Sequence, residues 1–318
     1  MRLFIFIEPH RGATYHDQAR VAQRVEEGGF EGFFRADHYM AFGEEQRLPG
    51  PTDAWLTLAG LALQTSRIRL GTLVTSATFR LPAALAISVA QVDQMSGGRV
   101  ELGLGAGWYE REHVSYGIPF PGVSERFDRL TEQLEIVTGL WKTPPGDRYS
   151  FHGEHYRLVD APALPKPVQR PGPPVIVGGR GPKRTPELAA RFADEYNVPF
   201  QSPDVVGKHF DLVREACDRL GREDSGRAPL RYSAGVVVFC GRTQEEVRRR
   251  SAIMYEKSAL PSEYHVAGSP AEVVDRLGAY AEIGASRLYL RIGDVTDPDY
   301  LDHLDLIASE VLPQVQTG

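Results

Sequence analysis

Eight short runs rich in valine, isoleucine, leucine and phenylalanine recur along the chain and are separated by amphipathic stretches. The runs cover residues 3–7, 32–35, 68–74, 100–104, 174–177, 195–198, 232–239 and 287–291. Strands that are buried on both faces are apolar almost throughout, and parallel strands require a crossover connection that is usually a helix. This alternation predicts a parallel sheet whose strands are covered by helices.

The stretches between these runs have helical periodicity. They cover residues 15–28, 54–65, 83–95, 124–141, 185–193, 203–220, 243–257 and 270–284, with a last one at 298–312. Thr52-Asp53 and Ser269-Pro270 place favourable capping residues at two of the helix starts. Eight strand–helix units close a (β/α)8 TIM barrel, and 318 residues suit one such barrel. We therefore predict a single barrel domain over residues 1–318.

The alternation lapses in a proline-rich segment at about residues 143–174. Two short runs inside it, 149–151 and 156–158, are expected to pair as a hairpin. Because the strand–helix alternation resumes directly afterwards, and a barrel divided here could not close, we interpret the segment as an insertion within the barrel.

The composition indicates a soluble globular protein, with 42% apolar and 25% charged residues. A net charge of -6 gives no broad basic surface for nucleic acid or an anionic membrane, so we expect a small-molecule partner. The apolar stretch 1–8 is too short for a signal peptide or a membrane span, which favours a cytoplasmic protein. Cys217 and Cys240 lack the CxxC spacing of a redox or metal site.

The second predicted strand ends in Asp37 and His38. In a (β/α)8 barrel the functional groups lie at the carboxyl ends of the strands, so both side chains are expected at the mouth of the barrel. A histidine exchanges protons near neutral pH, and a neighbouring carboxylate can fix its tautomer or raise its pKa. We interpret Asp37 and His38 as the catalytic candidates; the alternative is a histidine whose hydrogen bonds are satisfied at a strand end.

Two further strand ends have features that suit a ligand. After the third strand, small polar residues at 75–78 can hold a planar heterocycle, although an ordinary capped loop has the same composition. At the fourth strand, Gly103, Gly105 and Gly107 permit close approach by a ligand or by a neighbouring part of the chain. Their G-x-G-x-G spacing lacks the last glycine of a dinucleotide fingerprint.

The fifth strand leads into a glycine-rich turn, Gly178–Gly181, that is followed by a helix. Backbone amides at such a helix start bind phosphate, and the nearby cations Arg180, Lys183 and Arg184 add to the attraction. The alternative is a solvated basic cap, and we favour phosphate because the turn lies at a strand end. We predict no metal site, because Glu110, Glu112 and His113 after the fourth strand lack H-E-x-x-H spacing and the loop histidines His152 and His155 lack a third ligand.

In their order along the chain, these segments resemble the luciferase-like monooxygenase family, particularly its bacterial F420-dependent branch. The matching segments are 37–39, 70–80, 103–113, 174–179 and 193–197, so the resemblance covers nearly the whole chain. It implies a flavin or deazaflavin ring in the barrel mouth, over a bulge that in relatives often contains a non-prolyl cis peptide and that maps here to Leu73–Val74. In F420-dependent sugar-phosphate dehydrogenases a histidine at the position of His38 is a proposed base. Dimers are common in this family, so a homodimer is implied.

The resemblance also implies which residues bind the cofactor. They are Asp37, Leu73, Val74, Thr75, Gly105 and Gly107 around the ring, and Val177, Gly178, Gly179, Arg180 and Gly181 at the phosphate end. Phe42 and Trp108 stand where the sugar-phosphate dehydrogenases have a tryptophan and an acidic residue, which argues against a sugar phosphate as the substrate.

The favoured function is hydride transfer between C5 of F420 and a small organic substrate, with His38 handling the proton. One alternative is an FMN-dependent monooxygenase that uses reduced flavin and oxygen, because FMN shares a phosphate and much of the ring. Another is a flavin-binding protein without catalytic activity. The substrate is expected to depend on the loops 39–52, 108–123 and 254–268.

Overall fold

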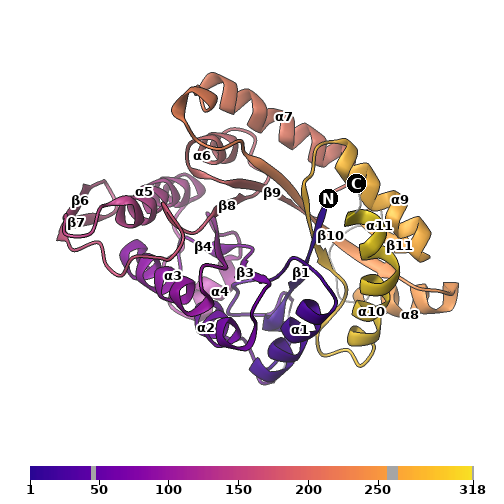
Figure 1. Cartoon of the computed structure of the whole chain (residues 1–318). Coiled ribbons are helices and arrows are strands. Elements are labelled where there is room, and N and C mark those ends of the chain that lie inside the picture. Colours follow the sequence, from indigo (N-terminus) through magenta and orange to yellow (C-terminus); the bar gives the residue numbers. More distant parts are fainter. Residues whose placement is uncertain (44–47, 256–263, 317–318) are drawn as a thin grey trace.

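The computed structural model describes residues 1–43, 48–255 and 264–316, and within them eight parallel strands pair in a closed ring (Figure 1). In ring order they are β1 (Arg2–Ile7), β2 (Gly32–Arg35), β3 (Arg69–Thr72), β5 (Val100–Gly105), β8 (Val175–Gly178), β9 (Glu195–Pro199), β10 (Arg231–Cys240) and β12 (Arg287–Arg291). The pairing of β12 with β1 closes the ring. Each strand overlaps a predicted one, and the predicted (β/α)8 barrel is confirmed.

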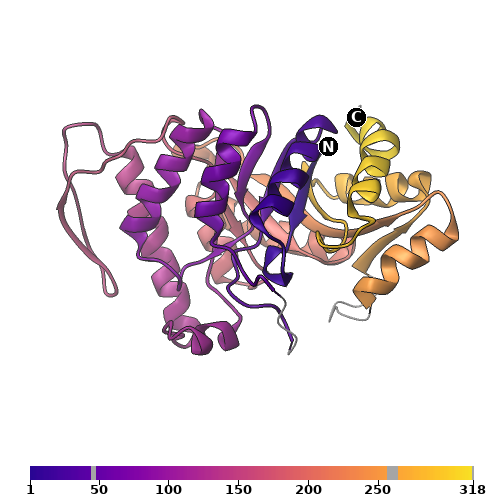
Figure 2. The same cartoon turned by 90° about the horizontal axis from the view of Figure 1, so that it is seen from below.

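Helices surround the ring of strands and cover its outer face (Figure 2). They are α1 (Tyr15–Glu27), α2 (Ala54–Gln64), α3 (Pro82–Ser96), α5 (Val123–Lys142), α6 (Arg184–Phe192), α7 (Pro203–Arg219), α8 (Gln244–Tyr255), α9 (Pro270–Glu282) and α10 (Tyr300–Leu306), which continues through a π-helical turn into α11 (Leu312–Gln316). The predicted caps form at two helix starts: Asp53 accepts the amides of Trp55 and Leu56, and Ser269 forms a capping box with Glu272. In the described residues, no helix combines the length and the apolar character needed to span a membrane.

The proline-rich segment contains the predicted hairpin, β6 (Tyr149–His152) with β7 (Arg157–Ala161), which lies outside the barrel beside α5 (Figure 1). Among the described residues, five short elements were not predicted: η1 (Pro9–Arg11), β4 (Thr75–Ser76), α4 (Glu110–Ser115), η2 (Glu223–Ser225) and β11 (His265–Gly268). Each is too short for its hydrophobic periodicity to be read from sequence. Residues 44–47 and 256–263, which belong to the expected substrate loops 39–52 and 254–268, lie outside the described residues.

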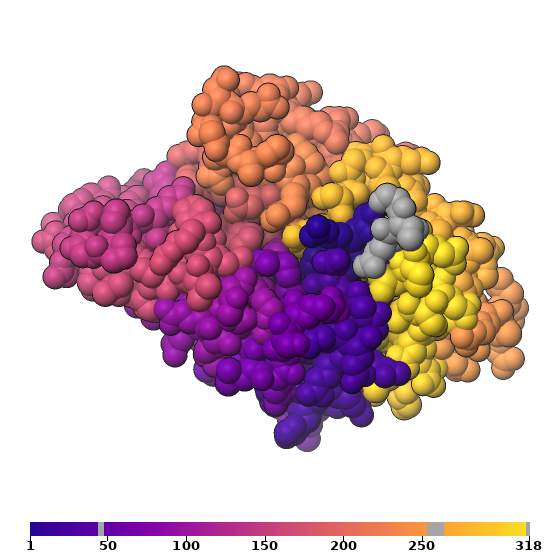
Figure 3. All heavy atoms as spheres, viewed as in Figure 1, coloured from indigo at the N-terminus to yellow at the C-terminus, as the bar shows by residue number. Residues whose placement is uncertain are grey.

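Because the strands are parallel, their carboxyl ends meet at one face of the barrel, which is the lower face in Figure 2. The other face holds both ends of the chain. There the amino group of Met1 donates to the carbonyl of Val315 in α11, at 3.3 Å. Figure 3 views this second face, with the first residues of β1 beside the C-terminal helix.

The barrel interior contains two layers of side chains, a charged layer at the amino ends of the strands and an aromatic layer nearer the mouth. At the amino ends of the strands, Arg287 donates to both Glu101 and Glu195 at 2.8 Å, and the Tyr289 hydroxyl donates to Glu195 at 2.7 Å. All four side chains are buried. Nearer the mouth is an aromatic cluster that includes Phe4, Phe6, Phe34 and Tyr289. Leu73 and Phe200 pack against this cluster. This filled interior makes the mouth the place where a ligand can bind.

We expect Arg287→Met to lower the free energy of unfolding by roughly 3–5 kcal/mol, because two buried carboxylates lose their shared cation. Urea unfolding at neutral pH measures the loss. Arg2→Met is the matched control, since Arg2 is exposed and pairs with Arg287 in the β1–β12 register. Equal stability of both variants would show that the charged layer contributes little.

Candidate active site at the mouth of the barrel

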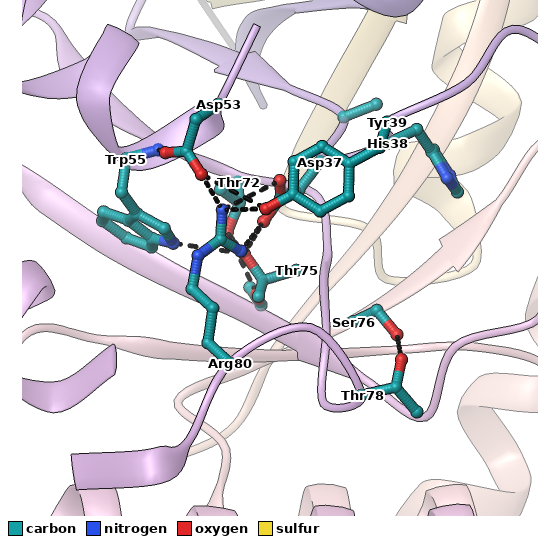
Figure 4. A network of polar contacts seen from close by, with 12 residues as sticks. Asp37, His38, Tyr39, Asp53, Trp55, Thr72, Thr75, Ser76, Thr78 and Arg80 are labelled. Carbon is teal, nitrogen blue, oxygen red and sulfur yellow. Dashed lines mark hydrogen bonds and ion pairs between the residues drawn. The ribbon is translucent and has the colours of Figure 1, made fainter. Parts of the chain in front are cut away.

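The carboxyl end of β2 is held by a buried network around Arg80 (Figure 4). Asp37 accepts from Arg80 Nη1 at 2.5 Å and from the hydroxyl of Thr75 at 2.9 Å. Arg80 also donates to Asp53 and to the hydroxyl of Tyr39, the latter at 3.0 Å. One guanidinium therefore joins the end of β2, the start of α2 and the loop before α3.

His38 points away from this network, as Figure 4 shows, and its partner is Glu112 on α4. Nδ1 of His38 lies 2.8 Å from Oε1 of Glu112, whose other oxygen accepts the backbone amide of Tyr39 at 2.9 Å. Glu112 is buried, whereas the His38 side chain is 15% exposed. A carboxylate on Nδ1 fixes the tautomer that carries its hydrogen there and leaves the lone pair on Nε2.

The expectation that Asp37 orients His38 is therefore wrong. Side chains of successive residues leaving a strand point to opposite sides, so adjacent residues rarely meet. Asp37 is engaged by Arg80 and Thr75, which makes it a structural anchor of the mouth. Glu112 was not among the catalytic candidates from the sequence. Its place shortly after the fourth strand was the signal that could have identified it.

Aromatic rings surround His38. Its ring centroid lies 4.9 Å from Phe42, 5.2 Å from His10 and 5.7 Å from Trp108. Trp108 is 63% exposed, so the cluster presents an apolar surface at the mouth. His10, which follows β1 in η1, was not among the sequence candidates. A histidine after the first strand could have been singled out by the same rule that selected His38.

The bond between Leu73 and Val74 is a cis peptide, as the resemblance implied. Leu73 and Val74 are half-buried, so part of each faces the mouth. A Cβ on Gly105 or Gly178 would lie 2.8 or 3.1 Å from a methyl group of Val74. The sequence left open whether a ligand or another part of the chain approaches the glycines of the fourth strand. At Gly105 it is the side chain of Val74 that does so.

Other predicted cofactor residues have partners of their own. Gly107 has a positive φ of 80°, and a Cβ there would clash with the hydroxyl of Ser76. The buried Thr75 hydroxyl, besides donating to Asp37, accepts from the indole of Trp55 at 3.3 Å. Both residues therefore shape the mouth from inside, and their contact with a cofactor stays a prediction.

The glycine-rich turn after β8 follows the predicted course into α6. Arg184, the first residue of that helix, donates to Asp128 and to the carbonyl of Ser124, and its guanidinium lies over Phe127. Arg180 and Lys183 are exposed. Two of the three predicted cations therefore remain accessible to an anionic ligand.

Glu8, at the end of β1, lies between two guanidinium groups. It forms ion pairs with Arg291 at 2.6 Å and with Arg11 at 3.0 Å, and its side chain is only 9% exposed. Burial alone would raise the pKa of Glu8, but the charges of Arg291 and Arg11 lower it from 4.5 to about 2. This carboxylate ties β1 to β12, the two strands that close the ring.

Known proteins are similar to this chain along most of its length. The model of the luciferase-like monooxygenase family matches residues 1–287. An F420-dependent glucose-6-phosphate dehydrogenase of Microbacterium testaceum is 28% identical over 92% of this chain and 91% of the relative. An FMNH2-dependent dimethylsulfone monooxygenase of Pseudomonas putida is 27% identical over 80% of this chain and 65% of the relative. A monooxygenase from Streptomyces bottropensis has the same fold, with a TM-score of 0.82 at 22% identity over 98% of this chain and 99% of that one.

The lowered pKa of Glu8 predicts how stability depends on pH. The carboxylate stabilises the folded state fully above pH 4.5, and this contribution disappears as the pH falls towards 2. We expect Glu8→Gln to be less stable than wild type by about 3 kcal/mol at pH 7 and to approach it near pH 2. Chemical unfolding across this range measures both curves. As a control, Glu282→Gln, at an exposed position, should have the same pH dependence of unfolding free energy as wild type. The same result for Glu8→Gln would show that the ion pairs of Glu8 do not stabilise the fold.

Proposed function

The chain belongs to the luciferase-like monooxygenase family, and on this premise we propose that it is an F420-dependent oxidoreductase that transfers a hydride between the deazaflavin and a small organic substrate. The observation that carries the proposal is the His38–Glu112 pair at the mouth of the barrel. It supplies a positioned proton carrier, which hydride transfer to or from an oxygen-bearing carbon requires. The similarity to an F420-dependent dehydrogenase over 92% of the chain favours F420 as the cofactor.

The residues at the mouth fit such a cofactor. Leu73 and Val74 form a partly exposed apolar floor above the aromatic interior, which suits a flat ring. The turn at Gly178 and Gly179 would hold the phosphate through its backbone. FMN, the alternative cofactor, also has a flat ring and a phosphate, and the relative from Pseudomonas putida is named for FMNH2.

Bound F420 supplies a carbon that accepts or donates hydride. The protein supplies the group that accepts or donates the proton. With its Nδ1 hydrogen held by Glu112, His38 accepts a proton at Nε2 when the substrate is oxidised and returns one when it is reduced. Glu112 acts on the substrate through His38 and is a positioning residue. The Arg80–Asp37 pair holds the backbone from which His38 projects.

We expect the protein to bind F420 more tightly than FMN, because Arg180 and Lys183 can attract the longer anionic tail of F420. Quenching of cofactor fluorescence measures both affinities. The double variant Arg180→Gln, Lys183→Gln should weaken F420 binding more than FMN binding, and its control is Arg191→Gln at the other end of α6. Micromolar FMN binding without detectable F420 binding would overturn the assignment in favour of the FMN-dependent monooxygenase.

We expect His38→Ala to lower turnover by roughly 10²- to 10⁴-fold while cofactor affinity changes only a few-fold, because one positioned proton carrier is lost. Turnover, cofactor affinity and melting temperature are measured on one preparation. His16→Ala, an exposed histidine on α1, is the control. A stable His38→Ala variant with normal turnover would remove His38 from the mechanism, and wild-type protein that binds F420 without turning over any substrate of a broad panel would indicate a flavin-binding protein.

A further inference from the structure

His10 is a buried histidine without a hydrogen-bond partner. Its ring is 1% exposed, and neither Nδ1 nor Nε2 has a partner among the residues that the structure describes. Buried polar groups are almost always paired, so an exception indicates a strained site, a trapped water or a place for a ligand. The location of His10 distinguishes these possibilities.

His10 lies beside the proposed proton carrier. The two imidazole rings are 5.2 Å apart and meet edge to face, and Phe42 lies over His10 at 4.7 Å. Phe42 in turn lies against the exposed Trp108, at 5.0 Å. His10 is therefore in contact with His38 and lies one aromatic ring, that of the half-buried Phe42, away from the exposed surface at Trp108.

The charge state of His10 restricts what it can bind. Burial lowers the pKa of His10, the charge of Glu8 opposes this, and His38, Arg11 and Arg291 lower the pKa again, so that together they bring it from 6.5 to about 3. The ring is thus neutral at physiological pH. A neutral imidazole offers one N–H donor and one lone pair. It suits an uncharged oxygen function, and it cannot balance the charge of an anion.

We propose that His10 is a second substrate-binding residue, whose N–H donates to the hydroxyl or carbonyl oxygen of the carbon that exchanges hydride. This inference rests on the proposed function and defines its substrate class as a neutral alcohol and the corresponding carbonyl compound. In oxidation, the C–H hydride passes to oxidised F420, the O–H proton passes to Nε2 of His38, and the C–O bond becomes C=O. Reduction reverses each transfer. His10 stays neutral throughout and stabilises the charge that develops on the oxygen.

The first test is His10→Phe, which keeps an aromatic ring and removes both unpaired nitrogens. We expect a melting temperature equal to or above that of wild type, because no hydrogen bond of the folded protein is lost. F420 affinity should be unchanged, and turnover of alcohols or ketones should fall about 10²-fold. His10→Asn, which retains an N–H donor, should recover part of that loss.

His303 provides the matched control. It is as buried as His10, but Nε2 accepts the amide of Cys240 and Nδ1 donates to the carbonyl of Ile292. His303→Phe should therefore lower the melting temperature. If His10→Phe lowers it equally, the His10 nitrogens serve the fold through a trapped water, and the proposal is wrong.

The second test needs no turnover. Nitrogen-15 NMR of histidine-labelled protein, with His10→Phe to assign the signals, is recorded during titration with 2-butanol and with butanone. We expect the His10 nitrogen signals to move with either probe and the His303 signals to stay in place. Signals of His10 that stay in place with both probes overturn the proposal. Failure of wild type to bind F420 would refute the proposed function alone, because the NMR and melting results do not depend on the cofactor.

Discussion

The pairing of the first strand with the last is the constraint on which the rest of the structure depends. Backbone hydrogen bonds join β1 to β12, and Glu8 reinforces them from its place between Arg291 and Arg11. Once the ring closes, all strands end at the same face, and side chains far apart in sequence become neighbours. His38 and Glu112, for example, are 74 residues apart and 2.8 Å from each other. A site of this kind exists only in the closed barrel.

Some polar groups at the mouth are paired with one another and stabilise the fold, whereas others keep atoms that could bind a ligand. Asp37, Asp53 and Arg80 satisfy one another, so none of them can exchange a proton without losing a buried ion pair. Glu112 binds only Nδ1 of His38 and leaves Nε2 for the proposed proton transfer. Neither nitrogen of His10 has a hydrogen-bond partner among residues 1–43, 48–255 and 264–316. Unpaired buried groups lower stability, which is the usual cost of a binding site prepared for a partner.

The same framework serves two related cofactors in the family. The proposed ring floor at Leu73 and Val74 and the proposed phosphate turn at Gly178 would suit any flavin-like ring with a phosphate. Under the proposed function, the choice between F420 and FMN depends on groups that contact the part the two cofactors do not share, such as the exposed Arg180 and Lys183. Under the same proposal, the reaction depends on which substrates can bind beside His38 and its aromatic neighbours.

The sequence by itself determined the order and type of the barrel elements, because each is specified by hydrophobic periodicity and capping within its own segment. It also placed Asp37 and His38 at the mouth, since position along a strand follows from the same pattern. Only the tertiary structure decided that Glu112 orients His38, that Gly105 makes room for Val74 and that His10 is buried without a partner. These features depend on the direction of side chains from different strands, and that direction is set by register and packing across the closed ring, which no local stretch of sequence encodes.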